Sequence, residues 1–239
     1  TTPATTIPGV IRLAGVVNAS GHGISLTVAA SGTQGRPLTI SGGAPTSDSG
    51  ALISIEWVRA GRADWTQVAT ATIAADGSFS VQWTPSANGQ VELRALLAPA
   101  GSDATDSSGS AGLSRSAGGS ASAAAGEIGT SAVTIPIFRN AVATLYGPGF
   151  WGHHTACGQR LTRTTLGVAS RTLKCGTEVA VRYKGRELTV PVIDRGPFAN
   201  RASWDLTMAT AKALGISQTA TIGTLASARV PTFAATASR

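Results

Sequence analysis

Short runs in which hydrophobic and polar residues alternate cover most of the first 140 residues. Phe79-Ser80-Val81-Gln82-Trp83 has an apolar residue at every second position, as in a strand with one buried face. The turn residues Ala75-Asp76-Gly77 precede it. Strands are predicted at 24–29, 37–41, 53–59, 67–73, 78–83, 91–97 and 133–138. This number and spacing of strands predict a β-sandwich of immunoglobulin type.

The pattern changes after residue 140. Strands are predicted at 142–146, 166–169, 178–183, 187–193 and 226–230. A helix is predicted from Met208 to Leu214, because Thr207 suits the N-cap and Gly215 suits the C-terminal stop. One helix among several short strands predicts a small mixed β-barrel, so the whole chain is expected to be mainly β.

The composition divides the chain into four parts. Residues 1–9 are expected to be a flexible leader, and residues 232–239 a tail. Residues 10–139 are assigned to the sandwich, with a Ser/Gly/Ala-rich loop or linker at 99–132, and residues 140–231 to the barrel. The chain begins at Thr1 without a basic-then-apolar leader, so we interpret it as a mature or trimmed chain. No membrane span is expected, because no apolar run approaches about 18 residues.

Positive charge is concentrated in the second half. Residues 1–140 carry seven basic and eight acidic side chains, whereas residues 141–239 carry twelve and four. A basic region attracts anionic partners. Nucleic acid is not expected, because the sequence has no run of Arg or Lys and no nucleic-acid-binding motif. An anionic cell-wall polymer is the other candidate partner.

Cys157 and Cys175 are the only cysteines in the chain. Such a pair predicts one disulfide, with two buried thiols as the alternative. The histidines are His22, His153 and His154, and their spacing to Cys157 matches no zinc site. No metal or other cofactor is therefore expected.

Asp194 and Asp205 are the candidate catalytic groups. Asp194 ends a predicted strand, and Asp205 lies eleven residues later, just before the predicted helix. Glycosidic-bond chemistry uses paired carboxylates, one of which burial or a neighbouring charge keeps protonated. Structural roles are the alternatives: Asp194 would anchor the turn through the Gly196 or Phe198 amide, and Asp205 would cap the helix.

Aromatic residues lie close to these acids in the sequence. Sugar C–H groups pack against aromatic rings, so four residues are candidates for substrate binding. They are Tyr146, Trp151, Phe198 and Trp204. Core packing is the alternative for Tyr146 and Trp204. Three tryptophans of the first domain are expected to fill the sandwich core, namely Trp57, Trp65 and Trp83.

Three basic or titratable residues complete the candidate binding set. His153 and His154 lie in a Gly-rich segment and are expected at the surface, where their protonated rings would contact an anionic substrate. Arg195 is expected to contact substrate or, alternatively, to pair with one of the two acids.

Residues 141–230 contain five short motifs, namely Ala143-Thr144-Leu145-Tyr146-Gly147-Pro148-Gly149-Phe150, Thr155-Ala156-Cys157-Gly158, Arg171-Thr172-Leu173-Lys174-Cys175-Gly176-Thr177, Asp194-Arg195-Gly196-Pro197-Phe198 and Asp205-Leu206-Thr207. In this order they resemble the motifs of the rare lipoprotein A (RlpA) family of lytic transglycosylases. More distantly, the segment is similar to expansins and related endoglucanases. The resemblance implies a six-stranded double-psi β-barrel that binds, and in the lytic enzymes cuts, cell-wall glycans.

The resemblance also implies individual roles. Asp194 matches an acid important for glycan cleavage, and Asp205 matches the acid that expansins require in their polysaccharide groove. Thr144 and Tyr146 match positions in the groove near that acid.

Two residues depart from the pattern of the lytic enzymes. Gln159 stands where those enzymes carry Glu and is kept as a substrate-binding candidate, and Ser170 stands where they carry His. Neither is an effective proton donor or acceptor without help. The sequence therefore predicts a secreted, monomeric bacterial wall protein that binds peptidoglycan, with lytic cleavage and expansin-like binding without cleavage as alternatives. A protein-interaction or inhibitor module is a third possibility.

Overall fold

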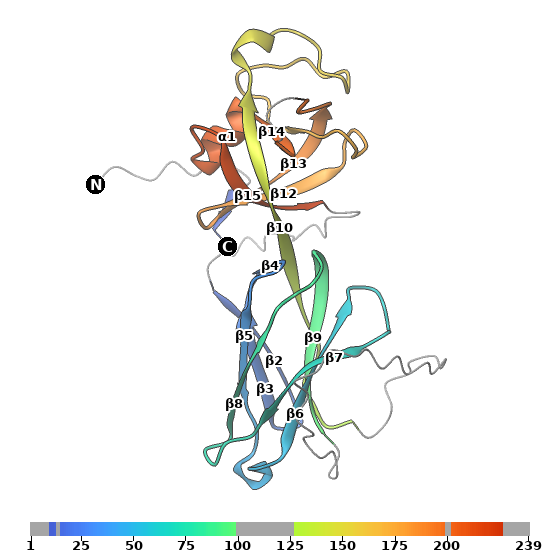
Figure 1. Ribbon diagram of the computed structural model, residues 1–239, viewed down its shortest axis with the longest axis vertical. Helices are drawn as coiled ribbons and strands as arrows, with labels where there is room; N and C mark the ends of the chain where they lie inside the picture. The colour runs from blue at the N-terminus through green and yellow to red at the C-terminus, as the bar shows by residue number, and fades with distance from the viewer. Residues whose placement is uncertain (1–9, 13–14, 99–126, 199–201, 227–239) are drawn as a thin grey trace, which may run out of the picture. The chain divides into compact units, whose positions relative to one another are not determined.

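The computed structural model describes residues 10–12, 15–98, 127–198 and 202–226 (Figure 1). The predicted leader and tail, and most of the predicted 99–132 loop, lie outside these ranges. The chain divides into two compact units. One contains residues 15–85 together with the described residues of 90–136, and the other contains the described residues from 137 onward with 10–12 and 86–89. None of the described helices is long and apolar enough to cross a membrane.

The first unit is a β-sandwich, as the alternation of apolar residues predicts. One antiparallel sheet has the order β2 (Val16–Gly21), β3 (Ile24–Ala29), β5 (Leu38–Gly43), β8 (Ser78–Trp83). The other has the order β7 (Thr66–Thr72), β6 (Leu52–Arg59), β9 (Gly89–Leu97), β10 (Val133–Tyr146). The short strand β4 (Gly32–Thr33) and the 3-10 helix η1 (Thr46–Asp48) complete the unit. Its immunoglobulin-type assignment stays a prediction.

Alternate side chains of the two sheets form the sandwich core. Ile40 and Ile55 are fully buried, and the Trp57 and Trp83 rings meet with centroids 5.9 Å apart. The prediction that Trp65 fills this core is wrong. The Trp65 ring instead packs against Arg94, and the Arg94 guanidinium lies 4.4 Å from the centroid of that ring.

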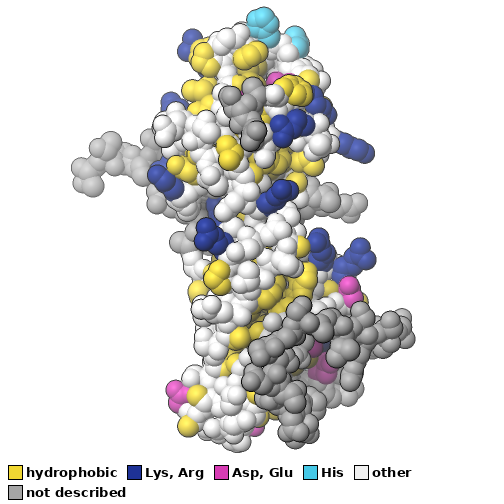
Figure 2. All heavy atoms as spheres, viewed as in Figure 1, with side chains coloured by type: hydrophobic (Ala, Val, Ile, Leu, Met, Phe, Trp, Pro, Cys, Tyr) yellow, Lys and Arg dark blue, Asp and Glu magenta, His cyan; other side chains and the backbone are white. Residues whose placement is uncertain are grey.

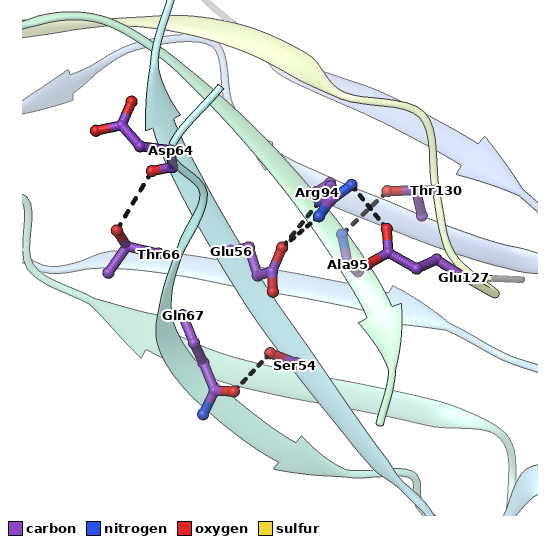
Figure 3. Close-up of polar contacts among 9 residues, drawn as sticks. All are labelled: Ser54, Glu56, Asp64, Thr66, Gln67, Arg94, Ala95, Glu127 and Thr130. Atoms are coloured by element: carbon purple, nitrogen blue, oxygen red, sulfur yellow. Dashed lines mark hydrogen bonds and ion pairs between the residues drawn. The ribbon is translucent and has the colours of Figure 1, made fainter. Parts of the chain in front are cut away.

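Arg94 is the centre of a charged network on the sandwich (Figure 3). Its Nε and Nη2 donate to Glu56 Oε2 at 2.9 and 2.7 Å, and its Nη1 lies 3.1 Å from Glu127 Oε2. Nearby, Ala95 N donates to the Thr130 hydroxyl. The segment that begins at Glu127 is therefore tied to β9 by an ion pair and by a hydrogen bond from the Ala95 amide to the Thr130 side chain.

The second unit is a closed six-stranded barrel with one short helix (Figure 1). Around the barrel the strands follow the order β10, β14 (Trp204–Thr207), β11 (Val168–Ala169), β13 (Arg186–Asp194), β12 (Glu178–Tyr183), β15 (Ala220–Ala226) and back to β10. The pairing of β10 with both β14 and β15 closes it. The 3-10 helix η2 (Pro148–Phe150) follows β10.

Apolar residues that alternate along these strands fill the barrel, and helix α1 (Met208–Leu214) covers the core. Fully buried members include Val179, Val190 and Leu206. The helix begins and ends as predicted: the Thr207 hydroxyl accepts from Thr210 N, and Gly215 adopts the left-handed conformation with φ 78°.

Several strands differ from the prediction. The two strands expected at 133–138 and 142–146 are one continuous strand, β10, which runs through the proposed boundary at Arg139. Strands β15 (Ala220–Ala226), β2 and β14 were not predicted, and the strand expected at 226–230 lies outside the described residues except for Ala226. Strand β1 (Val10–Arg12), which the sequence analysis assigned to the sandwich, pairs with β13 of the barrel.

Candidate functional site

The strand register places the two candidate acids in one row across the barrel wall. Ala169 of β11 pairs with Asp194 of β13 on one side and with Asp205 of β14 on the other. Asp205 in turn pairs with Thr144 of β10. Residues paired across neighbouring strands project from the same face of a sheet. We call Thr144, Asp205, Ala169 and Asp194 the acid row.

The acid row lies on the outer face of the barrel wall. Three of its members have a neighbour along the strand that is buried in the barrel core. Ala143 precedes Thr144, Val168 precedes Ala169, and Leu206 follows Asp205. Because side chains alternate along a strand, the acid row faces away from that core. Two strand spacings, about 10 Å, separate the Cα atoms of the two acids.

Asp205 is half-buried and incompletely paired. Its Oδ1 is buried and has no hydrogen-bond partner among the described residues. Burial raises the pKa of Asp205 above its ordinary value of 3.8, the nearby Thr144 hydroxyl opposes the change, and the negative charge of Asp194 adds to it. The Thr144 hydroxyl itself donates to Trp204 O at 3.3 Å. Asp205 is thus more easily protonated than an ordinary aspartate.

Tyr146 lies on the same face, because it is two residues beyond Thr144 on β10. Its hydroxyl is also buried without a hydrogen-bond partner in the described part of the chain. Burial raises the pKa of Tyr146, and the charges of Asp194 and Asp205 raise it further. Since buried polar atoms are normally hydrogen-bonded, two unsatisfied ones on one face mark a place where a ligand hydroxyl or a water would bind.

Asp194 belongs to the acid row and also accepts hydrogen bonds from two backbone amides. Its Oδ1 accepts hydrogen bonds from Ala156 N at 2.9 Å and from Arg195 N at 2.8 Å. The predicted structural alternative named the Gly196 and Phe198 amides, whereas the actual donors hold the loop at Ala156 against the end of β13. The other alternative is wrong for Asp205, because Thr207 caps the helix.

The side chain of Arg195 is directed to the backbone, not to an acid. Its Nη1 donates to Leu173 O at 2.8 Å and to Ser170 O at 3.3 Å, and its Nη2 lies 3.2 Å from Cys175 Sγ. Cys175 forms the predicted disulfide with Cys157. Arg195 and the disulfide therefore brace the loops on either side of Asp194, and the role of Arg195 in substrate binding stays a prediction.

The two positions that depart from the family pattern have different surroundings. Ser170 is buried, and its hydroxyl accepts from the Leu173 and Thr172 amides at 3.2 and 3.4 Å, so it caps a turn. Gln159 is exposed, and its main-chain carbonyl accepts a hydrogen bond from Thr155 N at 2.7 Å.

The segment after β10 presents several exposed side chains. Phe150 is 60% exposed, and its ring meets that of Tyr146 edge to face with centroids 6.4 Å apart. His153 and His154 are exposed as predicted. Trp151 is half-buried, and the Arg163 guanidinium lies 4.2 Å from its ring centroid.

Phe198 and Trp204 have opposite environments. Phe198 is 82% exposed and follows Asp194 by four residues. Trp204 is half-buried and packs against the barrel core, in register with the buried Ala143. Because it precedes Asp205 by one residue, its side chain projects from the opposite face, so the core alternative describes Trp204.

Sequence reasoning missed Arg171 as a positioning residue. Its Nη1 donates to Pro197 O at 2.6 Å and to Ala202 O at 3.0 Å, which ties together the two ends of the segment between β13 and β14. The place of Arg171 in an Arg-Thr-Leu motif is the one signal of this contact in the sequence. The described residues contain no cluster of three or more His, Cys, Asp or Glu side chains suited to a metal ion.

The second unit is thus a closed β-barrel with two carboxylates on one outer face. Comparisons with known proteins show which family this barrel resembles. Residues 139–225 match the model of the lytic transglycolase family. Residues 139–225 are therefore an RlpA-like double-psi β-barrel.

The curated relatives that share this segment include three transglycosylases. They are probable endolytic peptidoglycan transglycosylase RlpA of Synechocystis (41% identity over 88 residues), its namesake in Aquifex aeolicus (37% over 83) and endolytic peptidoglycan transglycosylase RlpA of Campylobacter jejuni (40% over 67). The matches cover 36%, 34% and 27% of this chain, and 27%, 37% and 24% of the relatives. The chain thus spans about a quarter to a third of their lengths.

Solved structures also match, among them that of a protease inhibitor. The Streptomyces papain inhibitor (SPI) is 27% identical, and the match covers 36% of this chain and 92% of the inhibitor with a TM-score of 0.29.

Proposed function

We propose that the barrel binds glycan strands of bacterial peptidoglycan on its outer face and cleaves them as a lytic transglycosylase. The acid row is the observation that carries this proposal, because it brings Asp194 and Asp205 to one face. The names of the curated relatives support the choice of peptidoglycan as substrate.

Asp205 is the acid in the proposed reaction. Its raised pKa keeps a larger share of the carboxyl protonated than in an ordinary aspartate, which suits a group that donates a proton. The proton passes to the oxygen that bridges two amino sugars, and the bond between this oxygen and the anomeric carbon breaks.

Asp194 is the ionised partner. Its negative charge stabilises the positive charge that develops at the anomeric carbon and ring oxygen. The 6-hydroxyl of the same sugar then bonds to the anomeric carbon and returns its proton to the Asp205 carboxylate. The product carries a 1,6-anhydro ring, and no water molecule is consumed.

Exposed aromatic rings and positive charge support binding of a long anionic polymer. Phe150 and Phe198 offer apolar faces to sugar C–H groups. Figure 2 shows Lys and Arg side chains spread over the barrel, with few Asp or Glu side chains on the face in view. We also propose that the protein acts as a monomer outside the cell, in contact with the bacterial wall.

Binding without cleavage is the second candidate function. The observation that favours it is the environment of Ser170, which is buried and engaged in a turn, so it cannot replace the missing histidine as a base. The Gln159 side chain likewise cannot act as a general acid or base, because its amide does not ionise near neutral pH.

Digestion of purified peptidoglycan tests both candidates. The wild-type protein should release fragments with 1,6-anhydro-muramyl ends, detected by mass spectrometry. Asp205→Asn should lower the rate by about 10²–10⁴-fold, and Asp194→Asn should also lower it. Glu178→Gln, on strand β12 of the same barrel, is the matched control and should leave the rate unchanged.

Sedimentation with insoluble peptidoglycan separates the two candidates. Wild-type protein that sediments with the polymer but releases no anhydro fragments would establish the second function. Protein that neither sediments nor releases fragments would contradict both.

A further inference from the structure

An irregularity in strand β13 puts Asp194 on the outer face. Val168 pairs with Val192, but the next residue, Ala169, pairs with Asp194, so Ile193 is an extra residue in β13. Val192 lies in the barrel core. In a regular strand, residues two apart share a face, and Asp194 would therefore point into the core beside Val192. The β-bulge at Ile193 reverses this direction.

Gly167 provides the space for the bulge. Ile193 is fully buried, and a Cβ added at Gly167 would lie 2.6 Å from its Cδ1 and Cγ1 and 3.0 Å from its Cγ2. No side chain larger than hydrogen fits at Gly167 while Ile193 keeps its position.

The backbone of Gly167 cannot easily move away from this contact. Its N–H donates to the Thr210 hydroxyl at 2.9 Å, and its carbonyl accepts from that hydroxyl at 3.1 Å and from Thr207 N at 3.2 Å. These bonds join Gly167 to the start of helix α1, two residues after Asp205. Gly167 thus contacts Ile193, next to Asp194, and also Thr207, two residues after Asp205.

We propose that Gly167 is a positioning residue, whose close contact with Ile193 sets the bulge that directs Asp194 to the outer face beside Asp205. Only the expected effect of Gly167 on glycan cleavage rests on the proposed function. The placement of Asp194 itself is measurable without any glycan.

The Ala156 amide reports on the position of the Asp194 carboxylate. Ala156 N donates to Asp194 Oδ1 at 2.9 Å, and the adjacent Cys157 N donates to Ile193 O at 3.3 Å. A change in the bulge should therefore break the Ala156 hydrogen bond and accelerate exchange of its amide hydrogen.

The test measures Ala156 amide exchange by NMR in three variants. Gly167→Ala should accelerate the exchange about tenfold, as expected for the loss of one hydrogen bond. Gly149→Ala is the matched control, because a Cβ there meets no atom within 4 Å, and it should leave the exchange unchanged. The double variant Gly167→Ala/Ile193→Ala removes the contacting atoms and should restore slow exchange.

Unchanged Ala156 exchange in Gly167→Ala would overturn the proposal. If that variant does not fold, the double variant decides: a folded protein with slow Ala156 exchange supports the proposal, and an unfolded protein or rapid exchange contradicts it.

Glycan cleavage provides the second readout. Gly167→Ala should lower the rate of cleavage but leave sedimentation with peptidoglycan unchanged, and the double variant should recover part of the rate. A wild-type protein that cuts no glycan would contradict the proposed function, while the exchange result would still decide the role of Gly167.

Discussion

Acidic side chains are held differently in the two units. In the sandwich, Glu56 Oε2 receives two hydrogen bonds from Arg94, and Arg94 also contacts Glu127 (Figure 3). In the described part of the barrel, neither Asp194 nor Asp205 forms an ion pair with Lys or Arg. The barrel is nevertheless the more basic region of the chain, with twelve basic and four acidic side chains from residue 141 on. Asp194 and Asp205 thus lack an ion pair in spite of the abundant positive charge.

In the sandwich, paired charges have a structural role. In the barrel, Asp194 and Asp205 remain available to a ligand. A paired carboxylate lowers the energy of the folded state, whereas a half-buried and unpaired one raises it. The barrel holds its acid row through backbone contacts and the disulfide instead, since Ala156 binds Asp194 beside Cys157 and Arg195 contacts Cys175. The barrel thereby keeps the carboxylates in place without neutralising them.

Removal of the disulfide should have the largest effect on stability. The double variant Cys157→Ser/Cys175→Ser opens a loop of 18 residues, and chain entropy predicts a loss of about 3 kcal/mol in the free energy of unfolding. Hydrogen exchange should show the loss in barrel strands such as β13. Full protection of these strands in the variant would mean that backbone contacts alone hold the acid row.

Neutralising one acid in each unit should change stability in opposite directions. Glu56→Gln should lower the free energy of unfolding by about 1 kcal/mol, because it weakens hydrogen bonds to a charged partner. Asp205→Asn should raise it at pH 7. The pKa of Asp205 is raised in the folded protein, so ionisation of this group costs stability as the pH rises above 3.8.

Thermal denaturation at several pH values measures this contrast. The stabilisation by Asp205→Asn should be present at neutral pH and disappear below pH 3.8, where the carboxyl is protonated in both folded and unfolded protein. Asp205→Asn that destabilises the protein at pH 7 would show that the carboxylate has a favourable partner after all.

Exposed apolar residues in the two units should differ in their effect on binding. Phe150→Ala should weaken sedimentation with peptidoglycan about fivefold, because it removes one ring from the face beside Tyr146. Val16→Ala is the control on the sandwich, where Val16 is 58% exposed, and it should have no effect. Equal losses of sedimentation in the two variants would show that the binding surface is not the face beside the acid row.

Much of the local structure follows from nearby residues. The helix from Met208 to Leu214 was predicted with its bounds, because the Thr207 side chain caps its start and the left-handed conformation of Gly215 ends it. The strands at 24–29, 78–83 and 178–183 were predicted with the right ends, since each alternates and is closed by turn residues. The disulfide between Cys157 and Cys175 was also predicted correctly.

Other features depend on contacts that no local pattern reveals. Strand β10 continues through Arg139 because its two halves pair with different partners, β9 in the sandwich and β14 and β15 in the barrel. Trp204 was a candidate for sugar contact, but its register with Ala143 directs it to the barrel core. Neither outcome is visible in hydrophobicity, because it depends on which strands meet.

By itself the sequence determined that this protein is mainly β, where its helix begins and ends, and which two acids to consider. Those conclusions need only the preferences of neighbouring residues. The tertiary structure alone decided that Asp194 and Asp205 share a face. The alternation of Val190, Val192 and Asp194 would direct all three side chains inward, and the extra residue Ile193, accommodated by Gly167 from another strand end, reverses the last of them.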